Sequence, residues 1–123
     1  MPIDYDTVLK GDVLWVTALG ETMSVDVLVE YVRAMTQDAL DMGVKKVLVD
    51  NRRIIGAMDV LQSHDFAVDV EEQIELAKTI RWAVVTSPER MKALRFFETV
   101  ARNRGLSILA FDTIEEAEDW LAV

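Results

Sequence analysis

The chain has 123 residues, of which 51% are hydrophobic and 28% charged, enough apolar material for one domain with its own core. It has no cysteine and one histidine, which excludes disulfides and thiolate chemistry, and we predict neither a metal nor a cofactor. The 22 acidic and 13 basic residues give a net charge of −9, which would repel nucleic acid. No apolar run approaches the roughly 20 residues of a membrane span, so the sequence predicts a soluble, cytoplasmic protein.

The first third of the chain predicts a β-hairpin followed by a long helix. Apolar and polar residues alternate over Tyr5–Leu9 and Asp12–Ala18, and Gly11 between them can supply the positive φ of a tight turn. Helical spacing follows over Val25–Met42, with Ser24 placed to cap its start.

The middle of the chain predicts a buried strand and an interrupted helix. The apolar run Val47–Val49 indicates a strand covered on both faces, which the polar residues Asp50–Arg53 close. We expect a loop or turn over Ile54–Met58 and a helix over about Ser63–Lys78, with a capping box at Asp69 that restarts the helix after a break.

The last third predicts two further strands and two further helices. A strand over Arg81–Thr86 leads into a helix that Ser87 caps and that runs to Arg104; a strand over Ser107–Phe111 and a helix capped by Thr113 complete the chain. This order predicts one α/β domain over residues 1–123, with a mixed, mostly parallel sheet of about five strands and about four helices.

Ligands of such sheets bind beyond the carboxyl ends of the parallel strands, which directs attention to the segments Asp50–Arg53 and Thr86–Arg90 and to Asp112. In the first, Asp50 is a candidate nucleophile, metal ligand or base, or simply a turn cap, and Arg52 and Arg53 either hold an anion or are solvated. In the second, Ser87 and Arg90 form either a small anion site or an ordinary helix start.

Three apolar residues, Met58, Phe66 and Trp82, either belong to the core or border an apolar pocket beneath the irregular middle segment. The lone His64 is interpreted as a surface or helix-cap residue. Acidic residues gather in 59–75 and basic residues in 89–104, which either steers a partner or marks two solvated helix faces.

Several segments resemble the SpoIIAA-like (STAS/SEC14-like) family of small bacterial proteins. They are Val8–Val13, Val47–Asp50, the helix after Ser87 and above all Phe111–Leu121. The resemblance implies a STAS-like sandwich and a regulatory partner protein, and its SEC14-like branch implies an apolar or lipid-like ligand. Anti-sigma-factor antagonists of this family are switched by phosphorylation just after the strand-end aspartate, but that position here is Asn51, which has no hydroxyl.

Two hypotheses follow. The first is a non-catalytic regulatory module that binds a protein partner, or itself as a homodimer, through a helix surface near Met58 to Phe66 and the adjoining strand ends. The second is a carrier or sensor of a small apolar or amphiphilic ligand near residues 54–66, whose polar head meets Arg52 or Arg53. An enzyme with Asp50 as base ranks third because no second catalytic group can be named. The candidate ligand-binding or partner-binding residues are Asp50, Asn51, Arg52, Arg53, Met58, Phe66, Trp82, Ser87 and Arg90; none is assigned as catalytic or metal-binding.

Overall fold

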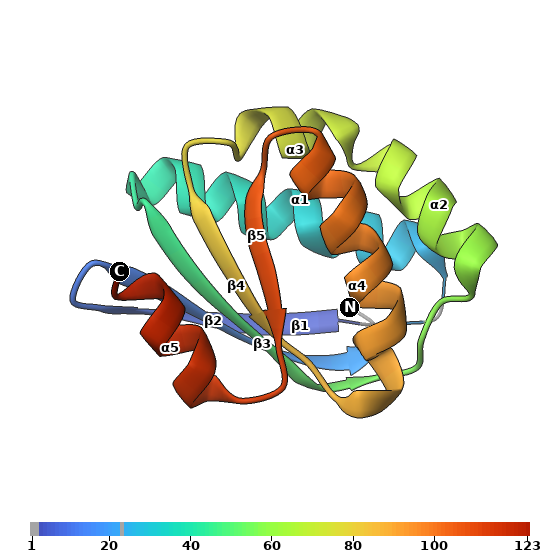
Figure 1. The fold of residues 1–123 in the computed structure, drawn as a ribbon, viewed down its shortest axis with the longest axis horizontal. Helices are drawn as coiled ribbons and strands as arrows, with labels where there is room; N and C mark the ends of the chain where they lie inside the picture. Colours follow the sequence, from blue (N-terminus) through green and yellow to red (C-terminus); the bar gives the residue numbers. More distant parts are fainter. Residues whose placement is uncertain (1–2, 23) are drawn as a thin grey trace.

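A five-stranded sheet separates two unequal helical layers in the computed structural model, which describes residues 3–22 and 24–123 (Figure 1). The elements in chain order are β1 (Ile3–Lys10), β2 (Val13–Glu21), α1 (Val25–Met42), β3 (Lys46–Ile55), α2 (Val60–Asp69), α3 (Glu71–Leu76), β4 (Arg81–Val85), α4 (Pro88–Asn103), β5 (Ser107–Phe111) and α5 (Ile114–Leu121).

The strands lie in the sheet in their sequence order. β1 and β2 form the predicted antiparallel hairpin, in which Gly11 has a φ of 62°, and every later pair is parallel. The expected mixed, mostly parallel sheet is therefore confirmed. Because the connections are parallel crossovers, the carboxyl ends of β3, β4 and β5 meet at one edge of the sheet.

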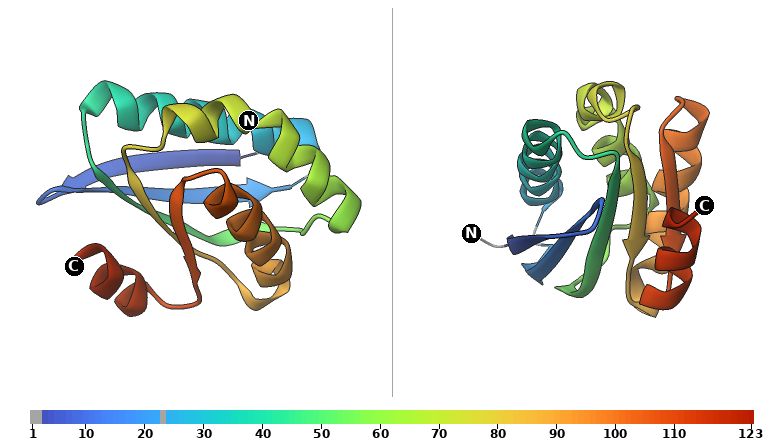
Figure 2. Two further views of the ribbon diagram at one scale, coloured as in Figure 1. Left: turned by 45° about the horizontal axis from the view of Figure 1, so that its top comes forward. Right: turned by 90° about the vertical axis from the view of Figure 1, so that its left-hand side faces the viewer.

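The helices divide between the two faces of the sheet. Residues of α1, α2, α3 and α4 share one large core cluster with the sheet, whereas α5 packs alone on the opposite face against Leu48, Ala83 and Val85. Figure 2 shows α1 and α5 on opposite sides of the strands. The run Val47–Val49 is fully buried, as expected for a strand covered on both faces.

Local signals place α1 as predicted. It spans Val25–Met42, the Ser24 hydroxyl accepts a hydrogen bond from the backbone N–H of Val27 at 3.3 Å, and Gly43 follows with a φ of 68°. The start of α5 is also as predicted, since the Thr113 hydroxyl accepts from the backbone N–H of Glu116.

Strand β3 is longer than the apolar run that predicted it. It continues through the polar residues and through Ile54 and Ile55, which had been expected in a loop. The cause is non-local, because Arg53, Ile54 and Ile55 pair with the end of β2 beyond an irregularity between Thr17 and Leu19.

The helix predicted over Ser63–Lys78 is two helices, so the described residues form five helices where about four were expected. A capping box at Asp59, which bonds reciprocally with Gln62, starts α2 before the predicted position. The expected break is present at Val70, but no side chain caps α3, so the predicted capping box at Asp69 is wrong. Val70 is fully buried, and the break points it into the core.

The prediction that the Ser87 side chain caps α4 is also wrong. Ser87 precedes the helix and Pro88 occupies its first turn as expected, but the Ser87 hydroxyl oxygen is buried and has no hydrogen-bond partner among the residues that the structure describes. Within the described part of the chain, no helix has the length and apolarity to cross a membrane.

Candidate ligand pocket

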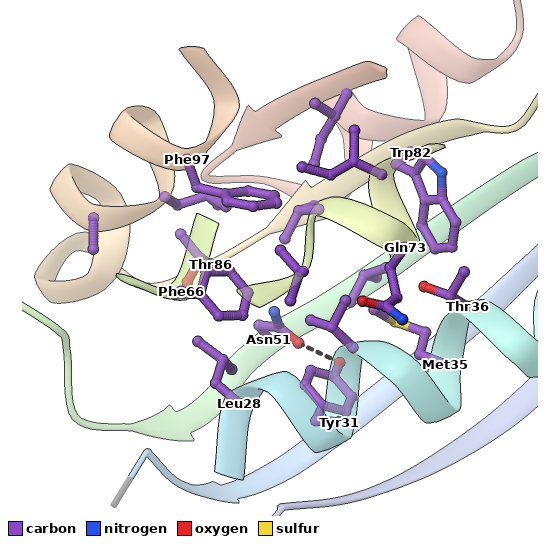
Figure 3. A pocket seen from close by; sticks show the side chains of 18 of the residues that line it. Leu28, Tyr31, Met35, Thr36, Asn51, Phe66, Gln73, Trp82, Thr86 and Phe97 are labelled. Atoms are coloured by element: carbon purple, nitrogen blue, oxygen red, sulfur yellow. Dashed lines mark hydrogen bonds between the residues drawn. The ribbon is translucent and has the colours of Figure 1, made fainter. Parts of the chain in front are cut away.

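A cavity of about 100 Å³ lies between the sheet and the large helical layer (Figure 3). Its walls come from strands β3, β4 and β5 and from helices α1 to α4. Most of its lining is apolar, and the aromatic rings of Phe66 and Phe97 pack together with their centroids 5.0 Å apart. Trp82 also lines the cavity, with its indole N–H donated to the Ala77 carbonyl oxygen at 3.3 Å.

Polar side chains gather where the pairing of β3 with β4 ends. Asn51 continues the face of β3 that carries Val49, and Thr86 directly follows β4, held extended by a hydrogen bond from its N–H to the Phe111 carbonyl. The Tyr31 hydroxyl donates to Asn51 Oδ1 at 2.8 Å (Figure 3). Burial raises the pKa of Tyr31 far above its ordinary value, so the phenol remains a donor.

Thr86 and Gln73 leave oxygen atoms without partners beside this cavity. Thr86 is 2% exposed, and its Oγ1 atom has no hydrogen-bond partner among the described residues; the same holds for Oε1 of Gln73. Buried polar atoms are usually satisfied by protein or water. These atoms are therefore available to a molecule in the cavity.

Arg90 reaches the cavity from the first turn of α4. Its Nε atom donates to the Gly56 carbonyl oxygen at 2.8 Å, and Gly56 turns the chain out of β3 with a φ of 90°. Burial lowers the pKa of Arg90 from its ordinary value, but a guanidinium stays charged at neutral pH. No described carboxylate forms an ion pair with it.

The strand-end residues of β3 point to different sides of the sheet. Asp50, on the α5 side, accepts from Arg52 Nε at 2.9 Å and Nη2 at 2.8 Å, and also from the Arg52 backbone N–H. Burial by itself raises the pKa of Asp50, but the hydrogen bonds from Arg52 outweigh it and hold the pKa below its ordinary 3.8. The carboxylate of Asp50 is therefore already paired with Arg52, whereas Asn51 faces the cavity.

The structure separates the nine candidate residues into two groups. Those that line the cavity are Asn51, Met58, Phe66, Trp82 and Arg90. Those outside it are Asp50, Arg52, Arg53 and Ser87, so neither Arg52 nor Arg53 is placed to meet the polar head of a ligand in this cavity.

Sequence reasoning missed Tyr31 and Gln73, and it placed Thr86 in a strand-end segment without giving its hydroxyl a role. Tyr31 belongs to the apolar stripe of α1, where a hydroxyl at a buried position could have been noticed, and Thr86 ends an apolar strand at the edge where ligands bind. The sequence gives no such signal for Gln73, because the direction of its side chain depends on the break between α2 and α3 at Val70.

A surface groove between α2 and α4 adjoins the cavity. Ala57, Met58 and Ala93 line both, and the groove continues past Ser63 and Phe96. The segment between β3 and α2 thus separates the cavity from the surface. Two large apolar side chains nearby are solvent-exposed, Ile55 at 64% and Leu61 at 71%. His64 is exposed too, as predicted.

Comparison with solved structures identifies the fold as SpoIIAA-like, the class to which STAS domains belong. An anti-sigma factor antagonist from Mycobacterium paratuberculosis superposes with a TM-score of 0.58 at 15% identity, over 98% of this chain and 95% of its own. The protein TM1081 gives 0.54 at 15% identity, over 97% and 89%. An uncharacterized DUF3478 family protein with a SpoIIAA-like fold from Shewanella loihica PV-4 gives 0.53 at 21% identity, over 97% and 93%.

No family model matches the sequence, and no curated protein matches it. The likeness to the solved structures therefore establishes the fold, and the predicted resemblance to SpoIIAA-like proteins is confirmed at that level.

Proposed function

We propose that this protein is a non-catalytic regulatory module that holds a small, mainly apolar molecule in the cavity between its sheet and helices α1 to α4. The single observation that carries this proposal is the cavity itself, with apolar walls and unpartnered buried oxygens of Thr86 and Gln73. Apolar pockets with a few convergent polar groups are typical of small-molecule sites.

The volume of the cavity limits its occupant. An engineered cavity of about 150 Å³ accommodates benzene, so one of about 100 Å³ accommodates an apolar group of about four carbons. A long fatty acyl chain would require α2 to move. The occupant favoured here is accordingly small, unlike the lipid that the SEC14-like resemblance implies.

Native mass spectrometry of protein purified gently from its own host tests the proposal. The wild-type spectrum should show a retained non-protein mass that is lost on collision. Ala93→Leu adds three carbons at the cavity wall, so it should abolish retention without unfolding the protein. Thr99→Leu, on an exposed position of the same helix, is the matched control and should retain the mass. An empty wild type, or equal retention in both variants, would count against the proposal.

A second candidate function is a protein-interaction module, and the two are compatible if ligand occupancy alters the partner surface. One structural neighbour is an anti-sigma factor antagonist, and the exposed Leu61 lies in α2, within the surface from Met58 to Phe66 proposed from the sequence. The exposed Ile55 ends β3, a few residues before that surface. Large apolar side chains on a surface favour association, either with a partner protein or as a homodimer.

Leu61→Glu tests this second function. It should abolish co-purification of a partner or self-association in analytical ultracentrifugation, and it should leave the unfolding free energy within about 0.5 kcal/mol because the side chain is solvated. Val68→Glu, on an exposed position of the same helix, is the control. Unchanged association in Leu61→Glu would contradict this assignment of the surface.

A further inference from the structure

The charge at one end of the cavity constrains what can bind there. Arg90 is the cationic residue of the lining, and no described carboxylate neutralises it. A partly buried guanidinium without a counter-charge is costly, since burial removes part of its hydration. An anion at this end of the cavity would supply the missing partner.

The neighbouring side chains are mostly hydrogen-bond donors. Asn51 Oδ1 already accepts from Tyr31, so the Asn51 amide nitrogen points away from that phenol (Figure 3). The hydroxyl of Thr86, buried and unpartnered, can donate as well. Asn51 and Thr86 lie side by side, because β3 and β4 pair in register up to Asp50 and Val85 and each polar residue follows directly.

The position of Arg90 adds to this field. It lies in the first turn of α4, a helix of 16 residues whose amino-terminal end carries partial positive charge. The Ser87 hydroxyl accepts no hydrogen bond from this end, so no side chain caps it in the described structure. The helix end, the guanidinium and the two donors all favour negative charge.

We infer that the ligand is a short branched-chain carboxylate whose carboxylate binds Arg90, Asn51 and Thr86 and whose apolar tail of about four carbons fills the cavity. This inference rests on the proposed function and adds to it the charge of the ligand. A carboxylate fits because its two oxygens can accept from a guanidinium in bidentate fashion. A neutral molecule of the same shape would leave Arg90 without a counter-charge.

A pair of probes with the same carbon skeleton tests the inference. 3-Methylbutanoate and 3-methylbutan-1-ol are titrated into ¹⁵N-labelled protein, and the indole signal of Trp82 and the backbone signals of Asn51 and Thr86 are followed. The wild type should bind the acid at least tenfold more tightly than the alcohol. Arg90→Gln should weaken the acid at least tenfold and leave the alcohol unchanged.

Two further variants keep the result interpretable. Arg90→Lys retains the charge and should recover part of the affinity for the acid, and it covers the case in which Arg90→Gln disturbs the contact with Gly56. Arg53→Gln, exposed and outside the cavity, is the matched control and should bind the acid like the wild type.

The possible failures are distinguishable. If the alcohol binds as tightly as the acid and Arg90→Gln changes neither, the inference is overturned while the proposed function stands. If neither probe shifts the cavity signals at any accessible concentration, both are overturned. If Arg53→Gln weakens the acid and Arg90→Gln does not, the carboxylate lies on the other side of the sheet and the inference is wrong.

Discussion

The two faces of the sheet differ in whether their buried polar groups have hydrogen-bond partners. On the α5 side, the carboxylate of Asp50 is fully occupied by Arg52, its neighbour in the same strand. On the cavity side, the hydroxyl of Thr86 is more deeply buried and has no described partner. Asp50 is the last residue of β3 that pairs with β4, and Thr86 directly follows β4, so the position alone does not distinguish them. This difference is what the proposed function predicts, in which the chain itself completes one face and a bound molecule completes the other.

The two faces of the sheet also differ in how helices pack against them. α5 closes over Leu48, Ala83 and Val85, all fully buried. On the other face, four helices cover larger side chains, and the break between α2 and α3 lies over the sheet beside the cavity. Helices that are joined by a break at Val70 can adjust their separation more easily than one rigid helix. We therefore expect the helices on the cavity face to adjust to a substitution more easily than α5 does on the other face.

The largest expected effect is a difference between two leucine truncations. Leu48→Ala on the α5 face should lower the unfolding free energy by about 4 kcal/mol, and Leu28→Ala, which lines the cavity, by about 2.5 kcal/mol, because the surroundings of Leu28 already contain space. Urea unfolding of both variants measures this difference. An equal or larger loss for Leu28→Ala would contradict the comparison.

A smaller effect is expected from Asp50→Asn. It should cost about 1.5 kcal/mol at pH 7, less than a fully buried charged hydrogen bond, because the Arg52 side chain is 49% exposed and water screens it. The pKa of Asp50 is lowered in the folded state, so its contribution is complete above about pH 4 and is lost as the pH falls through the folded value. Urea unfolding at several pH values should show wild type and variant converging in acid. A constant gap would show that the charge of Asp50 is not involved.

The smallest expected effect has the opposite sign. Thr86→Val removes an unpartnered buried hydroxyl at nearly constant volume and should stabilise the protein by about 1 kcal/mol. Thr17→Val, at an exposed position in β2, is the control and should change little. The stabilised Thr86→Val protein should nevertheless bind 3-methylbutanoate more weakly than the wild type. Destabilisation by Thr86→Val would mean that its hydroxyl already has a partner.

Much of the fold could be predicted because its signals are local. Ser24 and Gly43 delimit α1 within a few residues of sequence, and Gly11 marks the turn of the hairpin. The extension of β3 through Ile55 could not be predicted in this way, since it depends on pairing with β2. The sequence contains a local signal for the start of α2, because Asp59 and Gln62 form its capping box. The apolar pattern alone predicts a start at about Ser63, which is too late.

The candidate site was predictable only in its apolar half. Met58, Phe66 and Trp82 are large apolar residues near an irregular segment, which is enough to suggest a pocket. Its polar end depends on the order of the strands in the sheet, which places Thr86 beside Asn51. Sequence spacing cannot show that Asp50 and Asn51 face opposite sides with different partners.

Intermolecular nuclear Overhauser effects between 3-methylbutanoate and the protein test the central claim most directly. The methyl protons of the ligand should show contacts to the rings of Phe66 and Phe97 and to the methyl groups of Val84, all of which line the cavity. Contacts to Leu121 or Val85, on the α5 face, or to no buried residue at all, would contradict the account.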